Sequence, residues 1–201
     1  MTKKRLFIAI NLPDATKKKI SDVIVSLDSQ VNRRVAKQIG FRWMEPESWH
    51  LTISFLGYQL DDSIGPILKS MKEVGGDFAA FKIGFEDVVW APAGKSPRMI
   101  WMIGTEKTSN DLAMLKKKLE DSLIENGVRF KPETRKYNAH LTLARFSDGK
   151  NFNDLNIDLA SVPRNIFQSM DFTAQSIDLT ESELEHGGAR YIILQKDKFR
   201  K

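Results

Sequence analysis

At 201 residues, the chain is long enough to bury a substantial core, either as one domain or as two small lobes. It contains no cysteine, which excludes disulfides, thiolate nucleophiles and cysteine-based zinc or iron–sulfur sites. The net charge of +5 suits a phosphate-bearing partner but is not the dense basic tract of a nucleic-acid-binding tail. The apolar residues 6–12 are too few to span a membrane and precede no cleavage site, so we expect a cytoplasmic protein that binds no membrane.

A strand and an amphipathic helix are predicted at the beginning of the chain. Residues 5–11 are mostly apolar, and the Pro13-Asp14 pair is typical of a first helical turn. The next apolar residues recur three and four positions apart, as on a helix packed on one side: Ile20, Val23, Ile24 and Leu27. Residues 31–40 are polar, and we expect an exposed connection. Its basic side chains could steer an RNA, although a solvated loop is the default: Arg33, Arg34 and Lys37.

The first unusual feature follows a short strand at 41–44 and a turn at 45–48. Residues 49–56 read Trp-His-Leu-Thr-Ile-Ser-Phe-Leu, and this alternation of apolar and polar residues predicts a half-buried strand. On such a strand His50 and Thr52 share one face, and the other face carries Leu51, Ile53 and Phe55. The apolar row explains why the strand packs. It does not explain a histidine and a threonine side by side on the opposite face.

Two helices and two strands are predicted in the middle of the chain. The first helix runs from about residue 61 to residue 74 and is ended by Gly75-Gly76, with its start unsettled by Gly65 and Pro66. Residues 78–89 alternate like one long strand, and residues 99–103 return as a second strand after a turn. The second helix is closed by Asn126-Gly127 and carries a regular apolar stripe: Leu112, Leu115, Leu119 and Leu123.

The His-Leu-Thr motif appears a second time. Residues 139–146 read Ala-His-Leu-Thr-Leu-Ala-Arg-Phe, so His140 and Thr142 again share one strand face. The chain has only three histidines, and two of them occupy this same context. Arg145 falls on the face opposite to His140 unless the strand ends or bulges there.

The order of these elements describes an internal repeat. Each half runs strand, helix, a short segment that begins with arginine and ends with proline and glutamate (residues 42–47 and 129–133), and then a strand with His-Leu-Thr. Two lobes related by an approximate two-fold axis would bring the motif strands together, with two histidines and two threonines facing each other across one cleft. The tail adds two strands, at residues 172–179 and 191–195, joined by a loop in which we expect His186 to be solvated.

Two histidines at one reacting centre support acid–base chemistry. Because the unperturbed pKa of histidine is about 6.5, one imidazole can take a proton from a nucleophile while the other protonates a leaving group. The hydroxyls of Thr52 and Thr142 could donate hydrogen bonds to the non-bridging oxygens of a phosphodiester. Arg145 could reach the same phosphate from a strand end. The constellation therefore indicates phosphodiester chemistry without a metal.

The chain resembles the 2H phosphoesterase superfamily, which is defined by two His-x-Thr/Ser-x motifs. Within it, the chain looks most like the bacterial and archaeal RNA 2′,3′-cyclic phosphodiesterases, also named 2′-5′ RNA ligases. The resemblance extends over nearly the whole chain and is carried by residues 5–13, 49–57, 140–145 and 188–191. One departure is Ala139, which stands where the family usually has a proline and removes no reacting group.

The resemblance implies a single α+β domain over residues 1–201, with two pseudo-symmetric lobes, antiparallel sheets, outer helices and a central cleft that carries both motifs. It also implies hydrolysis of a 2′,3′-cyclic phosphate at the end of an RNA or oligonucleotide to a 2′-phosphate, without metal or cofactor. His50 would donate a proton to the departing 3′-oxygen, and His140 would be the base that activates water. The phosphate would be held by Thr52, Thr142 and Arg145. We expect the protein to act as a monomer.

Other interpretations stay open at this point. The same chemistry could act on a cyclic phosphate of ADP-ribose, or it could join or cleave a 2′-5′ linkage. The motifs indicate a phosphate but do not identify the group attached to it. The protein could also be an RNA-binding module with an idle site, and either histidine could be an ordinary strand residue. A metal site is disfavoured, since no carboxylate or third histidine has ligand-like spacing. The aromatic residues near the motifs could stack a base, but we expect each to be a packing residue: Trp43, Trp49 and Tyr137.

Overall fold

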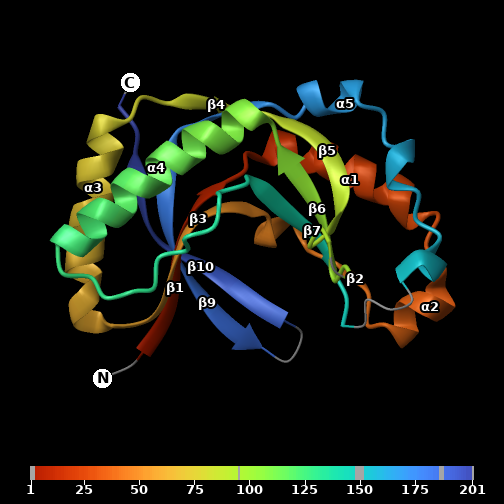
Figure 1. Ribbon diagram of the computed structural model, residues 1–201, viewed down its shortest axis with the longest axis horizontal. Helices are drawn as coiled ribbons and strands as arrows, with labels where there is room; N and C mark the ends of the chain where they lie inside the picture. The colour runs from red at the N-terminus through yellow and green to blue at the C-terminus, as the bar shows by residue number, and fades with distance from the viewer. Residues whose placement is uncertain (1–2, 95, 148–151, 186–187, 201) are drawn as a thin grey trace.

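Two four-stranded antiparallel sheets form the two lobes of the molecule in the computed structural model, which describes residues 3–94, 96–147, 152–185 and 188–200 (Figure 1). The first sheet has the strand order β10-β9-β1-β3 and the second β2-β7-β6-β5, while β4 and β8 form a separate two-stranded sheet. The strands are β1 (Lys3–Asn11), β2 (Arg42–Trp43), β3 (His50–Leu60), β4 (Phe81–Ile83), β5 (Phe85–Ala91), β6 (Met99–Gly104), β7 (His140–Arg145), β8 (Phe172–Ala174), β9 (Ser176–Glu185) and β10 (Gly188–Lys198). The predicted α+β fold with antiparallel sheets is confirmed.

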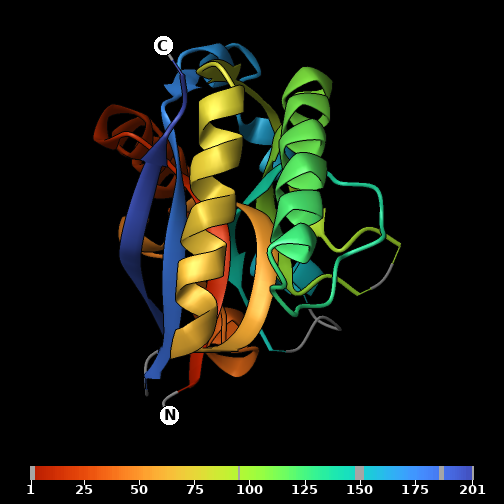
Figure 2. The ribbon, with the colours of Figure 1, turned by 90° about the vertical axis from the view of Figure 1, so that its left-hand side faces the viewer.

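The helices lie outside the two sheets (Figures 1 and 2). They are α1 (Asp14–Asp28), α2 (Arg33–Gln38), α3 (Ile64–Asp77), α4 (Glu106–Glu125) and α5 (Asn165–Gln168). The stripes predicted on α1 and α4 face the core, and the four leucines of α4 are completely buried. Each such side chain contributes about 1.5–3 kcal/mol by leaving water, which holds these helices on the sheets. Among the described residues, no helix has both the length and the apolar character needed to cross a membrane.

The predicted repeat is visible in the topology. In the first half β1, α1 and β3 follow one another, and in the second half β6, α4 and β7 do the same. β1 pairs antiparallel with β3, as β6 pairs with β7. A helix from each half contacts the other half of the chain. The helix α4 follows β6 of the second sheet but packs mainly against α3 and β3 of the first half. From α1, Thr16 Oγ1 donates a hydrogen bond to the carbonyl oxygen of Met170, 3.3 Å away.

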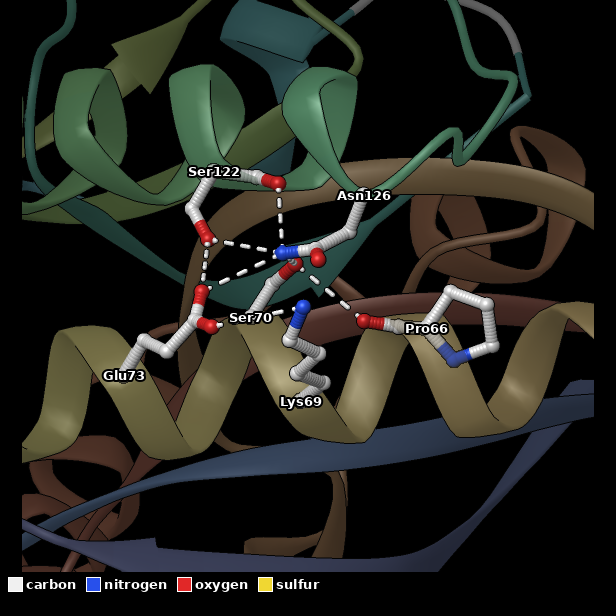
Figure 3. Close-up of polar contacts among 6 residues, drawn as sticks. All are labelled: Pro66, Lys69, Ser70, Glu73, Ser122 and Asn126. Carbon is white, nitrogen blue, oxygen red and sulfur yellow. Dashed lines mark hydrogen bonds and ion pairs between the residues drawn. The ribbon is translucent and has the colours of Figure 1, made fainter.

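A polar seam joins α3 to α4 (Figure 3). The Asn126 side-chain nitrogen lies 3.0 Å from Ser70 Oγ and 3.2 Å from a carboxylate oxygen of Glu73, both on α3. Ser122 Oγ donates to that same carboxylate at 2.9 Å. Asn126 caps α4, and Gly127 follows with a positive φ of 78°, so the predicted helix end is confirmed. The seam therefore links the helix of one half to the helix of the other.

Two predictions about local structure were wrong. Residues 31–40 contain a helix, α2, because the Asn32 side chain accepts hydrogen bonds from two backbone N–H groups of its first turn. The expected strand over 78–89 is broken at Gly84 into β4 and β5, which belong to different sheets. A Cβ at Gly84 would lie 3.1 Å from an Asp171 carboxylate oxygen, a tight contact that glycine avoids.

The end of α3 also differs from the prediction. The helix does not stop at Gly75-Gly76 but runs through them to Asp77. A Cβ at Gly75 would lie 3.0 Å from the Lys198 carbonyl oxygen, which explains the glycine by close approach to β10 rather than by termination. The C-terminal strands are longer than predicted, because β9 and β10 form a hairpin that spans residues 176–198. His186 lies outside the described residues.

Candidate active site

Both motif strands contain a β-bulge at the same place. In β3, Thr52 stands opposite Ala9 and Ser54 opposite Ile8, so Ile53 is the extra residue. In β7, Thr142 stands opposite Trp101 and Ala144 opposite Ile100, so Leu143 is the extra residue. An extra residue shifts the alternation of the side chains that follow it by one position.

The bulges move two side chains onto the face of the histidines. Phe55 was predicted to lie in the core beside Leu51 and Ile53, and this was wrong: its side chain is 61% exposed and lines the cleft. Arg145 reaches the cleft as well. The sequence predicted Arg145 on this face only if its strand ended or bulged, and the bulge at Leu143 meets that condition. Phe55 and Arg145 thus occupy equivalent positions in the two repeats. The first repeat presents an aromatic ring at this position and the second a guanidinium.

A cleft of about 570 Å³ lies between the two sheets and brings the predicted residues together. Its wall includes all five of them: His50, Thr52, His140, Thr142 and Arg145. The other basic and apolar side chains on the wall include Arg5, Phe7, Arg42, Phe55, Leu184 and Tyr191. The cleft is therefore basic, and its lining contains no carboxylate among the described residues.

His140 is held in a defined tautomer. Its Nδ1 lies 2.9 Å from the carbonyl oxygen of Asn138, and because a carbonyl can only accept, Nδ1 carries the hydrogen. The lone pair of Nε2 is left free, as a general base requires. One face of the imidazole stacks on the indole of Trp101, with ring centroids 3.9 Å apart and an interplanar angle of 25°.

His50 has a matching backbone partner but different neighbours. It makes a backbone hydrogen bond with Ser48, two residues earlier, just as His140 does with Asn138. Its ring packs against Phe7 at a centroid distance of 4.7 Å and against the edge of Tyr191 at 5.0 Å. The two histidines are therefore fixed in the same manner by the backbone and surrounded differently by aromatic rings.

Burial and positive charge lower the pKa of both histidines. Burial is the main cause for His50, whose pKa falls to about 4, and the charges of Arg145 and His140 lower it further. The pKa of His140 is also lowered, first by burial and then by Arg145, while its hydrogen bond to Asn138 opposes the change. The effects of Arg145 on both rings, and of His140 on His50, arise from charges that act across one cleft.

The chain matches the sequence family described as LigT like Phosphoesterase over residues 16–101 and 103–191. Each of these stretches contains one of the two histidines. The chain belongs to this family. Membership confirms the resemblance to the 2H phosphoesterases and the prediction that the protein is an enzyme.

Named relatives of this LigT-like phosphoesterase agree with that assignment. An RNA 2′,3′-cyclic phosphodiesterase of Archaeoglobus fulgidus is 33% identical over 141 residues, which cover 70% of this chain and 72% of the relative. One from Methanocaldococcus jannaschii is 28% identical over 192 residues, covering 96% and 99%. The apo structure of E. coli LigT covers all of both chains with a TM-score of 0.74 at 18% identity, a likeness of fold.

The aromatic residues considered as base-stacking groups are not among the cleft lining of the LigT-like phosphoesterase. Trp43 donates its indole N–H to Asp28 Oδ1 at 2.7 Å, and Trp49 is buried in the core. Tyr137 is largely buried, and its hydroxyl donates to the carbonyl oxygen of Thr52 at 2.7 Å, so it braces the motif strand from behind. The aromatic rings that do line the cleft are Phe7, Phe55 and Tyr191.

Sequence reasoning missed two arginines of the wall. Arg5 lies at the start of β1 and Arg42 on β2, opposite Arg145. Both occur in segments that were predicted to be strands, but nothing local indicates that these segments border the histidines. Of the basic residues of α2, Arg33 is paired with Asp28 at 2.6 Å. None of the three basic residues singled out on α2 lines the cleft.

The part of the chain that the structure describes has no group of three or more histidine, aspartate or glutamate side chains able to hold a metal ion. The polar groups of the cleft wall are instead imidazoles, hydroxyls and guanidinium groups. Such groups suit an anionic ligand and proton transfer rather than cation coordination.

Proposed function

We propose that this LigT-like phosphoesterase hydrolyses 2′,3′-cyclic phosphate ends of RNA to 2′-phosphates. The observation that carries the proposal is the cleft with a histidine and a threonine from each repeat on its wall, next to the guanidinium of Arg145. The names of the relatives from Archaeoglobus fulgidus and Methanocaldococcus jannaschii support the choice of substrate. E. coli LigT, which has the same fold, has been crystallised in complex with 3′-AMP, which supports a nucleotide ligand.

In the proposed reaction, His140 Nε2 takes a proton from water as the water oxygen bonds to phosphorus. The bond from phosphorus to the 3′-oxygen breaks, and His50 donates a proton to that oxygen. The phosphate keeps its bond to the 2′-oxygen. One imidazole gains a proton and the other loses one, so the protein returns to its starting state by exchanging protons with solvent.

The phosphate would be held by Arg145 and by the hydroxyls of Thr52 and Thr142. Charge builds on the non-bridging oxygens as water attacks, and a fixed guanidinium and two hydroxyl donors stabilise that charge without reorganising. Because the residues that carry the reaction include no metal ligand set, we expect turnover to be unaffected by EDTA.

The histidine roles are tested by His50→Ala and His140→Ala. Each change removes one proton-transfer group, so each is expected to lower kcat by at least about 100-fold. The substrate is an RNA with a 2′,3′-cyclic phosphate end, and mass spectrometry after digestion identifies which oxygen keeps the phosphate. Arg129→Ala, an exposed residue that does not line the cleft, is the control. Turnover retained by either histidine variant, or a 3′-phosphate product, would contradict the proposal.

A panel of substrates tests which molecule carries the phosphodiester that the enzyme hydrolyses. Cyclic mononucleotides, an RNA with a cyclic phosphate end, a cyclic phosphate of ADP-ribose and 2′-5′-linked oligonucleotides contain related phosphodiesters. We expect the RNA with a cyclic phosphate end to have the highest kcat/KM. A higher kcat/KM for ADP-ribose cyclic phosphate, or cleavage or joining of 2′-5′ linkages instead, would replace the proposed substrate and leave the chemistry standing.

A further inference from the structure

The closest ring contact in the cleft is the stack of Trp101 on His140. The two rings are nearly parallel, with centroids 3.9 Å apart. Trp101 lies on β6, the strand paired with β7, and stands opposite Thr142. The indole is not among the groups that line the cleft, whereas His140 is, so the stack leaves part of the imidazole open to a ligand.

This stack breaks the symmetry of the two repeats. The residue of β1 that corresponds to Trp101 is Ala9, which stands opposite Thr52 as Trp101 stands opposite Thr142. His50 instead meets the tilted ring of Phe7 and the edge of Tyr191. Only His140 therefore rests on the face of an indole, the aromatic surface that attracts a cation most strongly.

Among the described residues that line the cleft, no carboxylate is available to stabilise a protonated His140. The charged and titratable groups that share the cleft wall with it are Arg145 on its own strand, His50 on β3, Arg42 on β2, Arg5 on β1 and Tyr191 on β10, and β6 contains none. All of these are cationic or neutral. In serine-protease-type triads a buried aspartate stabilises the imidazolium, and that element is missing from the cleft wall described here. The positive charge formed on His140 must be accommodated in another way.

We propose, building on the function proposed above, that Trp101 is a positioning residue whose indole face stabilises the imidazolium formed when His140 takes a proton from water. The electron-rich face lies against one side of the ring, while the Asn138 carbonyl accepts from Nδ1 at its edge. Together they fix the orientation of the imidazole and favour its charged state.

The stabilisation grows as the proton moves, so it acts on the reaction step rather than on substrate binding. Neutral imidazole gains little from the quadrupole of the indole, whereas imidazolium gains a cation–π attraction. Removing that attraction is expected to lower kcat by about 3- to 30-fold with KM nearly unchanged. It should also increase the acid dissociation constant of the His140 imidazolium by a comparable factor, which makes the residue a weaker base.

The test replaces Trp101 site-specifically by monofluorinated, difluorinated and tetrafluorinated tryptophan. Fluorine withdraws charge from the indole face while the ring keeps nearly the same shape, so the burial of His140 is conserved. We expect kcat to fall stepwise with the number of fluorines, and the pKa of His140, followed by NMR of labelled histidine, to fall in parallel. Trp101→Phe, which keeps a weaker aromatic face, should fall between wild type and Trp101→Leu in kcat.

The control is the same fluorinated series at Trp90, a half-buried tryptophan on the neighbouring β5 that packs on Phe146 and Phe152. There, neither kcat nor the pKa of His140 should change. A pKa of His140 that is insensitive to fluorination at Trp101, or a KM that rises as kcat falls, would overturn the inference. The NMR titration needs no turnover, so it distinguishes this failure from a failure of the proposed function, in which the wild-type protein forms no product.

Discussion

Burial and the charge of Arg145 disfavour the imidazolium forms of both His50 and His140 in the free protein and lower the pKa of each. The depression of the pKa is large for His50, to about 4, which makes its protonated form a stronger acid than an ordinary imidazolium. A bound phosphate opposes these causes, since its negative charge offsets Arg145 and favours protonated imidazole. Substrate binding and protonation of the cleft are therefore coupled.

This coupling predicts different pH dependences for the two kinetic parameters. The quantity kcat/KM reports the free enzyme, and we expect it to peak below pH 6.5 and to fall as pH rises, because His50 is then deprotonated. The profile of kcat should lie at higher pH, since the phosphate raises both pKa values in the complex. Rates measured from pH 4 to pH 8 at constant ionic strength check this. A kcat/KM that keeps rising above pH 7 would contradict it.

At the scale of elements, the bulged strand β3 is held in place by α4. Ser54, the residue just after the bulge, is buried and donates a hydrogen bond to Glu120 at 2.8 Å. Glu120 forms an ion pair with Lys116 at 2.6 Å, and both side chains are only 11% exposed. Tyr137 adds its hydrogen bond to the Thr52 carbonyl. The strand that carries His50 is thus anchored through side chains of the second half of the chain.

The buried pair predicts an asymmetric response to mutation. Glu120→Ala leaves Lys116 without its carboxylate and is expected to lower the free energy of unfolding by about 3–5 kcal/mol. The double variant Lys116→Met with Glu120→Gln removes both charges but keeps an acceptor for Ser54, so its loss should be much smaller. Urea unfolding at pH 7 measures both variants. Equal losses would mean that the charges are not coupled in the folded state.

For the whole molecule, the decisive feature is that residues from two sheets face each other, so the relative position of the lobes sets the geometry of the cleft. The packing of α4 against β3 and the seam between α3 and α4 help to fix that position (Figures 1 and 3). Within the seam, hydrogen bonds from Ser122 and Asn126 hold the pKa of Glu73 below its usual value. The contribution of Glu73 to the stability of the folded state is therefore present above the ordinary carboxyl pKa and is lost as the pH falls through the depressed value.

The seam is tested with Asn126→Ala. Loss of its hydrogen bonds to α3 is expected to destabilise the protein by about 1 kcal/mol, which lowers Tm by about 2–4 °C in a chain of this size. Because the seam does not line the cleft, kcat/KM should stay within about twofold of wild type. The matched control is Asn110→Ala, an exposed residue at the other end of α4. An unchanged Tm in Asn126→Ala would show that the seam contributes nothing to stability.

Residue order alone was enough to predict the two motifs, the repeat, the main helices and strands, and the shared face of the histidine and threonine on each motif strand. These follow from local periodicity and residue type, which a single strand or helix expresses on its own. Tertiary structure alone decided the bulges at Ile53 and Leu143, the breaks around Gly84, the passage of α3 through Gly75, and the positions of Arg5, Arg42 and Trp101 beside the site. Each of these depends on contacts between segments far apart in the chain, and such contacts leave no periodic trace in the sequence.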